Sequence, residues 1–297
     1  MSDPASTRTG TPAPGEPGWR PRLVALDIDG TLLRWVAGLG MSHEEVTPAV
    51  HDAVQAVLDS GAHVVLSSGR APHNMTVVAD MLALHGHGER LWIVAANGAV
   101  VLRYPPAEVV HEVTFDAAPA VAAVLQQHPE ALVAVEERGI GYRVSAPFPA
   151  GELGGESIVA AVEEMVSQPV SRVIIRDPKA TAEDFVRLAE GLGLHGTDYV
   201  VGWTAWLDLA PVGVSKASGL EYVAQQLGVD RADVLAIGDG RNDLEMLAWA
   251  GRGVAMGQSV DEVKEVADDV TASVDEDGAA VEIARWFPAA GSAGMDA

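Results

Sequence analysis

LVALDIDGTLL, at residues 23–33, is the stretch around which the chain is organised. Its first four residues are apolar and predict a buried parallel strand, because the run is too short for a helix. Asp27 and Asp29 follow this strand, and Gly30 lets the chain turn sharply. Carboxylates at the carboxyl end of a parallel strand lie where open α/β sheets bind ligands. The stretch therefore predicts a site suited to a hard cation and an oxygen nucleophile.

Two plainer interpretations of these aspartates are a turn cap and a calcium-binding loop. The calcium loop fails, because setting Gly30 as its invariant glycine puts Ala25 and Val36 at ligand positions. The turn cap is the better alternative for an isolated pair of aspartates. Other parts of the chain decide the matter, because they supply further polar groups at the ends of predicted elements.

Length and composition exclude several classes of protein. The 297 residues suit one large or two ordinary domains, and 48% hydrophobic residues are enough for a core. Cysteine is absent, which excludes disulfides, thiolate metal sites and a thiol nucleophile. No apolar run is long enough to cross a bilayer, and residues 1–20 lack the apolar core of a signal peptide. We therefore expect a cytoplasmic protein without a membrane partner.

The net charge of −23 argues against nucleic acid or an anionic membrane surface as a partner. Such a charge also repels phosphorylated small molecules, so an anionic substrate would need a local cation. A bound metal becomes more plausible for this reason. The three lysines, Lys179, Lys216 and Lys264, become informative positions.

The chain between residues 21 and 101 alternates strands with helices. Residues 1–20 are rich in Pro, Gly, Ser and Thr, and we expect them to be a disordered tail. The pattern predicts helices over 48–60 and 72–84, and strands over 63–66 and 92–95. This alternation predicts an α/β fold, a doubly wound and mostly parallel sheet with right-handed crossovers.

From residue 102 the pattern changes to half-polar strands, which are typical of an antiparallel sheet with one solvent-exposed face. The expected strands are 109–114, 131–136, 140–145, 172–176 and 199–203, and the expected helices are 158–166 and 181–192. We interpret 102–206 as an inserted α+β domain. The core domain is then 21–101 plus 207–287, and 288–297 is a C-terminal tail.

The α/β alternation resumes after residue 206. Ser215 is a good N-cap for a helix that Gly228 ends, and residues 234–237 predict another buried strand. Lys216 falls in the first turn of that helix, where the macrodipole disfavours a cation by roughly up to 1 kcal/mol. A lysine in this position either reaches into water or faces an anion such as a phosphoryl group.

Two loops add polar groups at the same expected sheet edge. Ser68 and Gly69 end the 63–66 strand, and a hydroxyl beside backbone amides at a helix start can bind phosphate, although such a loop is often only a turn. The loop Gly238-Asp239-Gly240-Arg241-Asn242-Asp243 follows the 234–237 strand. Its carboxylates could only cap the loop, but carboxylates that face Asp27 and Asp29 repel unless a cation joins them. The combination predicts a Mg²⁺ site.

These motifs, in this order and spacing, resemble the haloacid dehalogenase superfamily. The long insertion, Asn97-Gly98-Ala99 and Pro211-Val-Gly-Val-Ser-Lys216 are similar to the Cof-type subfamily with its C2 cap. The resemblance covers roughly residues 22–102 and 207–287, and across the insertion it is only architectural. Ser68 stands where this subfamily more often has threonine, and Gly257-Gln258-Ser259 replaces the more usual Gly-Asn-Ala.

The resemblance implies a role for each motif residue. Asp27 would be the nucleophile that forms an aspartyl-phosphate, and Asp29 the general acid and base. Lys216, Ser68, Gly69 and Asn242 would bind the phosphoryl group. Asp27, Asp239 and the backbone carbonyl of Asp29 would ligate Mg²⁺, with Asp243 and Asn242 holding the loop, the water and Lys216. Arg70 and His73, just past the phosphate loop, are expected to face the cap.

We expect a Mg²⁺-dependent phosphomonoester hydrolase for a small metabolite, either a sugar phosphate or a phosphorylated cofactor precursor. A phosphotransferase of the phosphomannomutase type remains open, because such enzymes share the cap class and all four motifs. That reaction would require a second, basic phosphate site in the cap. A non-catalytic binding protein on the same scaffold is a weaker alternative, since every catalytic residue type is present.

Overall fold

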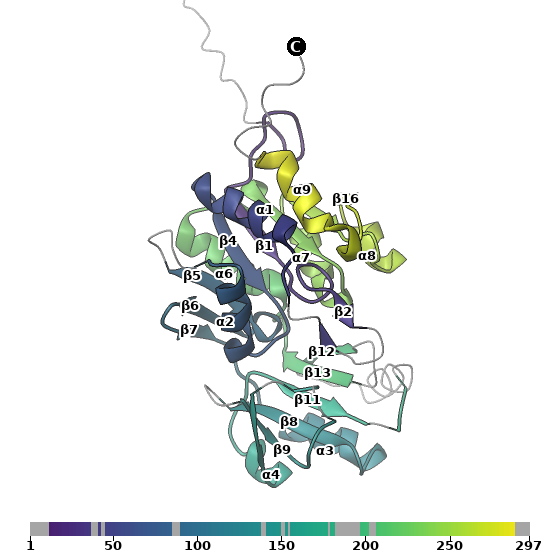
Figure 1. Cartoon of the computed structure of the whole chain (residues 1–297). Helices are drawn as coiled ribbons and strands as arrows, with labels where there is room; N and C mark the ends of the chain where they lie inside the picture. Colours follow the sequence, from purple (N-terminus) through teal and green to yellow (C-terminus); the bar gives the residue numbers. More distant parts are fainter. Residues whose placement is uncertain are drawn as a thin grey trace, which may run out of the picture.

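A computed structural model describes residues 12–36, 41–42, 45–84, 90–137, 141–149, 152–153, 155–177, 179–181, 197–201 and 206–288. These residues form an eight-stranded sheet, a six-stranded sheet and a small two-stranded ribbon, β2 (Trp35–Val36) with β3 (Met41–Ser42). The six-stranded sheet lies beside one end of the larger one (Figure 1).

The eight-stranded sheet has the order β16-β15-β14-β1-β4-β5-β6-β7. Its first six strands run parallel and the last two are antiparallel. Their bounds are β1 (Leu23–Leu26), β4 (His63–Ser67), β5 (Leu91–Ala95), β6 (Val100–Tyr104), β7 (Glu108–Glu112), β14 (Val234–Gly238), β15 (Arg252–Ala255) and β16 (Asp269–Val270). The predicted α/β fold with a mostly parallel sheet is confirmed.

Helices cover both faces of this sheet. Strand β1 shows how the two layers arise, because Val24 and Leu26 face one layer and Leu23 and Ala25 the other. The first layer contains α1 (Pro48–Asp59), α2 (Pro72–Met81) and α9 (Gly278–Trp286). The second contains α6 (Lys216–Leu227), α7 (Leu244–Trp249) and α8 (Asp261–Val266).

Local sequence fixes where α6 begins and ends. The Ser215 side chain accepts a hydrogen bond from the Ser218 amide, while the Ser218 hydroxyl accepts one from the Ser215 amide. Gly228 ends the helix in the left-handed conformation at φ 62°. The predicted cap and stop residues of this helix are therefore confirmed.

The six-stranded sheet has the order β10-β9-β8-β11-β13-β12. Its strands are β8 (Leu132–Glu137), β9 (Gly141–Val144), β10 (Glu156–Val159), β11 (Val173–Arg176), β12 (Thr197–Val201) and β13 (Trp206–Pro211). All pairs are antiparallel except β9 with β10. One face packs on α3 (Ala118–Gln127) and α4 (Val162–Met165), which form its own hydrophobic core.

Strand pairing gives different limits for the insertion from those predicted. Residues 102–112 belong to the larger sheet, because β6 pairs with β5 and β7 pairs with β6. Strand β13 belongs to the smaller sheet, although residues 207–211 were predicted to be core. We therefore propose that the insertion runs from about residue 115 to residue 211. From here on, this segment is called the cap.

Two further expectations need correction. Trp19 is not part of a disordered tail: it is 3% exposed, its indole N–H donates to the Ala232 carbonyl at 3.0 Å, and its ring lies 4.9 Å from that of Trp286. The predicted helix over 158–166 is instead a strand that ends at Val159, followed by the single turn α4. Residues 1–11, 182–196, 202–205 and 289–297 lie outside the described residues, as do the expectations that fall on them. No described helix combines the length and apolar character that spanning a bilayer requires.

Candidate active site

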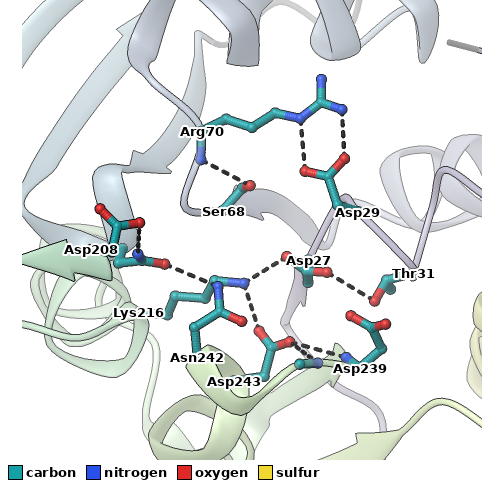
Figure 2. Close-up of polar contacts among 12 residues, drawn as sticks. Asp27, Asp29, Thr31, Ser68, Arg70, Asp208, Lys216, Asp239, Asn242 and Asp243 are labelled. Atoms are coloured by element: carbon teal, nitrogen blue, oxygen red, sulfur yellow. Dashed lines mark hydrogen bonds and ion pairs between the residues drawn. The ribbon is translucent and has the colours of Figure 1, made fainter. Parts of the chain in front are cut away.

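Four loops meet at one edge of the larger sheet. Because β1, β4, β5 and β14 are parallel, the residues after their last positions lie at the same edge. Asp27 follows β1, Ser68 follows β4, Asn97 follows β5 and Asp239 follows β14. Lys216 reaches this edge from the first turn of α6 (Figure 2).

Lys216 is the centre of the cluster and is fully buried. Its Nζ donates to Asp27 Oδ1 at 2.6 Å and to Asp243 Oδ1 at 2.7 Å. Burial acts to lower the pKa of Lys216, but the charges of Asp243 and Asp27 outweigh it and raise that pKa above its usual value. The ammonium therefore stays charged, and it is not the water-exposed lysine of the plainer interpretation.

Asp243 holds the loop after β14 as well as Lys216. Its Oδ2 accepts hydrogen bonds from the backbone amides of Asp239 at 3.0 Å and Gly240 at 2.9 Å. Both carboxylate oxygens are thus engaged by neighbouring donors. Asp243 contributes to the site by positioning Lys216 and the Asp239 loop.

Asp27 and Asp239 carry negative charge that the protein compensates incompletely. Burial raises the pKa of Asp27 to about 7, helped by the charge of Asp243 and opposed by Lys216. Burial and the charge of Asp27 raise the pKa of Asp239 to about 8. Oxygens of Asp27, Asp239 and Asp243 lie within 4.8 Å of one another. An all-oxygen donor set in which two buried carboxylates repel each other fits a hard divalent cation.

Gly30 permits the close approach of the first loop to Asp239. Its φ is +85°, and a Cβ there would lie 2.1 Å from Asp239 Oδ2. Any other residue would both strain the turn and displace the carboxylate. The glycine of the DIDG stretch is therefore needed for the geometry of the acidic cluster.

The phosphate loop presents a hydroxyl and an amide. Ser68 Oγ accepts a hydrogen bond from the Arg70 amide at 3.2 Å, which leaves its own proton for another acceptor. Gly69 packs against the Asn97 side chain, since a Cβ would lie 3.0 Å from Asn97 Oδ1. Ser68 is buried, at 2% exposed, so these donors are held in a fixed position.

Asn97 and Gly98 connect the loop after β5 to the Asn242 loop and to the start of α6. Asn97 Oδ1 accepts a hydrogen bond from Asn242 Nδ2 at 3.0 Å. Gly98 has φ +101°, and a Cβ there would lie 2.0 Å from the Ser215 carbonyl, next to Lys216. The start of α6 therefore rests on this loop, which aligns the Lys216 side chain with the sheet edge.

Asp29 is turned toward Arg70. Arg70 Nε donates to Asp29 Oδ2 at 2.8 Å and Nη2 donates to Oδ1 at 2.6 Å, a bidentate ion pair (Figure 2). Arg70 was expected to face the cap, and the contacts described place its guanidinium on the first loop of the core. His73 does face the cap, with its ring 6.1 Å from that of Tyr142.

Two residues of the site were not given a role from the sequence. Thr31 Oγ1 donates to Asp27 Oδ2 at 3.1 Å. Gln258 Nε2 donates to the Gly30 carbonyl at 2.6 Å and lies 3.4 Å from Asp239 Oδ2, while its Oε1 accepts from the Val274 amide. The unusual Gly-Gln-Ser sequence at 257–259 was the available signal, because an amide side chain in this loop can reach the acidic cluster.

The cap covers the phosphate loop. Ala71 of the core packs in one cluster with Ala134, Tyr142, Val144 and Ile174 of the cap. Asp208 Oδ2 on β13 lies 3.5 Å from Asn97 Nδ2. Side chains from the cap therefore lie next to the loops that meet at the sheet edge.

A family profile described as haloacid dehalogenase-like hydrolase matches residues 24–283. The chain belongs to this family. Among its relatives, the phosphoglycolate phosphatase of Natronomonas pharaonis is 32% identical over 255 residues, which cover 86% of this chain and 93% of that protein. The 5-amino-6-(5-phospho-D-ribitylamino)uracil phosphatase YitU of Bacillus subtilis is 28% identical over 287 residues, which cover 90% of this chain and 98% of that protein.

Solved structures agree with this assignment. The phosphatase BT1666 from Bacteroides thetaiotaomicron has a TM-score of 0.71 at 28% identity, covering 89% of this chain and 94% of that one. This haloacid dehalogenase-like hydrolase is therefore a phosphatase, as its motifs predicted, and its similarity to Cof-type members extends through the inserted sheet.

Proposed function

We propose that this phosphatase is a Mg²⁺-dependent phosphomonoester hydrolase that acts through an aspartyl-phosphate on a small phosphorylated metabolite. The observation that carries the proposal is the cluster of Asp27, Lys216, Asp239 and Asp243, in which one buried ammonium and a set of crowded carboxylates lie beside a hydroxyl and amide loop. The proposal includes a cytoplasmic location, supported by the composition of the chain.

Asp27 is the proposed nucleophile. Its Oδ1 is held by Lys216 and its Oδ2 by Thr31, so the carboxylate orientation is fixed before substrate binds. A carboxylate oxygen of Asp27 forms a bond to phosphorus as the bond from phosphorus to the ester oxygen breaks. Water then attacks phosphorus, the bond to Asp27 breaks, and inorganic phosphate is released with Asp27 restored.

Asp29 is the proposed acid and base. In its acid form it gives a proton to the departing ester oxygen, and as a carboxylate it takes a proton from the attacking water. Its ion pair with Arg70 points the side chain away from Asp27 (Figure 2). Asp29 must leave Arg70 to protonate a leaving group, so we infer that substrate entry or cap closure breaks this pair.

The phosphoryl oxygens are bound, in this proposal, by Ser68, Gly69, Lys216 and Asn242. The Ser68 hydroxyl and Gly69 amide donate from one side, and the Lys216 ammonium adds a full positive charge. Fixed donors of this kind each contribute on the order of 3 kcal/mol to transition-state stabilisation. A side chain of Asn97 keeps Asn242 in place through the 3.0 Å hydrogen bond.

Asp27, Asp239 and the backbone carbonyl of Asp29 would hold the Mg²⁺. The bound ion would neutralise the crowded carboxylates and the charge on the phosphoryl oxygens. The raised pKa values of Asp27 and Asp239 support this assignment, because each carboxylate lacks enough positive charge from the protein alone.

The phosphotransferase alternative requires an unpaired basic site in the cap. In the part of the cap that the structure describes, the basic side chains are paired with carboxylates, namely Arg143 with Glu164, Arg172 with Asp208, Arg176 with Glu152 and Lys179 with Glu130. This pairing favours hydrolysis over transfer to a second phosphorylated substrate.

Phosphate release from p-nitrophenyl phosphate tests the proposal. We expect turnover with Mg²⁺, none after chelation, and a loss of about 10⁴-fold or more in kcat for Asp27→Asn with unchanged circular dichroism. A mutase would release almost no phosphate in this assay. Substantial hydrolysis by Asp27→Asn would remove Asp27 as the nucleophile.

A further inference from the structure

The cap sheet presents a polar face to the phosphate loop. Side chains alternate along its strands, so that Val133, Val135, Val173 and Ile175 pack on α3 and α4. The alternate positions lie on the other face, the one that packs on Ala71 beside the phosphate loop. This second face contains Ala134, Glu136, Tyr142, Val144, Arg172, Ile174 and Asp208.

Arg172 and Asp208 neutralise each other on this face. Arg172 Nε and Nη2 donate to the two carboxylate oxygens of Asp208 at 2.6 Å and 2.7 Å, and both residues are buried. The Asp208 carboxylate is also the group that lies 3.5 Å from Asn97 Nδ2. The pair therefore marks where the cap face adjoins the site.

Glu136 is a further charged residue of the face, and it has no such partner among the described residues. Its Oε2 is buried without a hydrogen-bond donor among the residues that the structure describes. Burial raises the pKa of Glu136 to about 7, with the charge of Arg172 opposing the rise and that of Asp208 adding to it. A buried acceptor left without a donor is unfavourable, and a ligand that supplies a donor would remove this cost.

We propose that Glu136 is a specificity-determining residue that accepts a hydrogen bond from a hydroxyl of the leaving group and excludes leaving groups that carry a carboxylate. The inference rests on the proposed phosphatase reaction. The ester would bind with its phosphoryl group at Lys216 and its remainder against the cap face.

Charge on the face explains the exclusion. Arg172 contributes one positive charge, while Glu136 and Asp208 contribute two negative charges when ionised, and Arg176 is occupied by Glu152. A carboxylate on the leaving group would meet an uncompensated negative charge in a buried setting, whereas a hydroxyl would satisfy the free Oε2. The favoured substrates are thus phosphate esters of neutral polyols.

Matched pairs of esters test the proposal at pH 8, above the pKa of Glu136. Glycerol 3-phosphate and 3-phosphoglycerate differ in one terminal group, CH₂OH against carboxylate, and so do glucitol 6-phosphate and 6-phosphogluconate. We expect the wild-type enzyme to have the larger kcat/KM for the neutral ester of each pair. In Glu136→Gln this preference should fall by about tenfold or more, because the charge is lost while the size is kept.

Two controls separate this effect from a general disturbance. Glu164→Gln removes an equal charge from α4 on the opposite side of the cap sheet, where Glu164 pairs with Arg143, and should leave the preference unchanged. Turnover of p-nitrophenyl phosphate should stay within about threefold of the wild type in Glu164→Gln, and circular dichroism should be unchanged in both variants. That turnover also tests the phosphatase reaction itself, so its absence in the wild type would count against the proposed function.

Three outcomes would overturn the role of Glu136. They are a preference of the wild type for the carboxylated esters, a preference in Glu136→Gln equal to that of the wild type, and hydrolysis of p-nitrophenyl phosphate without measurable turnover of either neutral ester.

Discussion

The sheet edge of the core and the polar face of the cap are both buried networks of charge, but they are built differently. At the core edge, glycine turns bring carboxylates into contact that the protein cannot fully compensate, and one lysine holds them together. On the cap face, regular strands carry charges that mostly pair with each other, as Arg172 does with Asp208. The core network is therefore suited to chemistry that needs fixed groups and a cation. In the cap network, a single side chain can be substituted without disturbing the others, and this suits discrimination between substrates.

The largest expected effect of a single change is at Lys216. Lys216→Met should lower kcat for p-nitrophenyl phosphate by about 10⁴-fold or more, because the variant loses a charged contact to the phosphoryl group and leaves Asp27 and Asp243 unpaired. Removing one member of a buried ion pair also costs about 3–5 kcal/mol of stability. Thermal unfolding measures that cost, and Lys216→Met/Asp243→Asn should recover part of the stability without the activity. Wild-type turnover in Lys216→Met would show that the core network does not depend on this ammonium for the reaction.

A smaller effect is expected at Asp29, and it should depend on the leaving group. Asp29→Asn should reduce kcat/KM for an alkyl phosphate by about 10²- to 10⁴-fold, since the alkoxide needs a proton to leave. The reduction for p-nitrophenyl phosphate should be clearly smaller, because nitrophenolate leaves readily without protonation. Steady-state rates for the two esters give the ratio directly, and equal losses for both would exclude the general-acid role.

The ion pair between Arg172 and Asp208 of the cap offers the converse test. Arg172→Met should destabilise the protein by about 3–5 kcal/mol, because it leaves Asp208 buried and unpaired. Turnover of p-nitrophenyl phosphate should nevertheless stay within about tenfold of the wild type, as the reacting groups belong to the core. Urea unfolding gives the loss of stability, and phosphate release from the same preparation gives the change in turnover. A thousandfold loss of turnover in a folded variant would remove the distinction between the two networks.

The smallest effect concerns pH and stability without metal. Asp27 and Asp239 have pKa values of about 7 and about 8 in the folded protein, above the usual 3.8. The folded state thus holds more protons than the unfolded state between pH 4 and pH 8, and stability must fall as pH rises through this range. We expect the thermal midpoint in EDTA to drop by about 2–4 °C or more between pH 5 and pH 8. Asp239→Asn should flatten the drop, and Mg²⁺ should oppose it at pH 8; a midpoint that rises with pH would contradict the crowding of carboxylates.

The sequence predicted the core better than the cap for a physical reason. Buried parallel strands such as β1 and β14 are continuous apolar runs that end in distinctive loops, so their positions and their common edge follow from pattern alone. Strands β6, β7 and β13 are half-polar, and such strands look alike whichever sheet they join. The limits that we propose for the insertion differ from the predicted ones, residues 102 and 206, at these strands. The segment 158–166 was misassigned because its run of five apolar residues, 158–162, fits either a strand or a helix.

Site residues were predictable where a short motif carried them. Asp27, Ser68, Lys216 and Asp239 each follow a strand or begin a helix, and the structure brings them to one edge. Gln258 and Arg70 gained their contacts through tertiary packing of loops that are distant in sequence, so no spacing rule marked them. Glu136 lies in a strand outside any motif, where only the three-dimensional neighbourhood reveals that its Oε2 lacks a donor among the described residues.

The contact between Trp19 and Trp286 brings the beginning and the end of the described fold together. Helix α9, which contains Trp286, lies on the side of the core away from the cap (Figure 1). Chain ends that are neighbours can be joined by a short linker and the chain reopened elsewhere. A circular permutant opened at the turn between β6 and β7 would keep all four loops of the sheet edge intact. Because Tyr104 pairs with Leu91 at the amino end of β5, this turn lies at the sheet edge opposite the four loops, and reporters or partner domains could be attached there away from the acidic cluster.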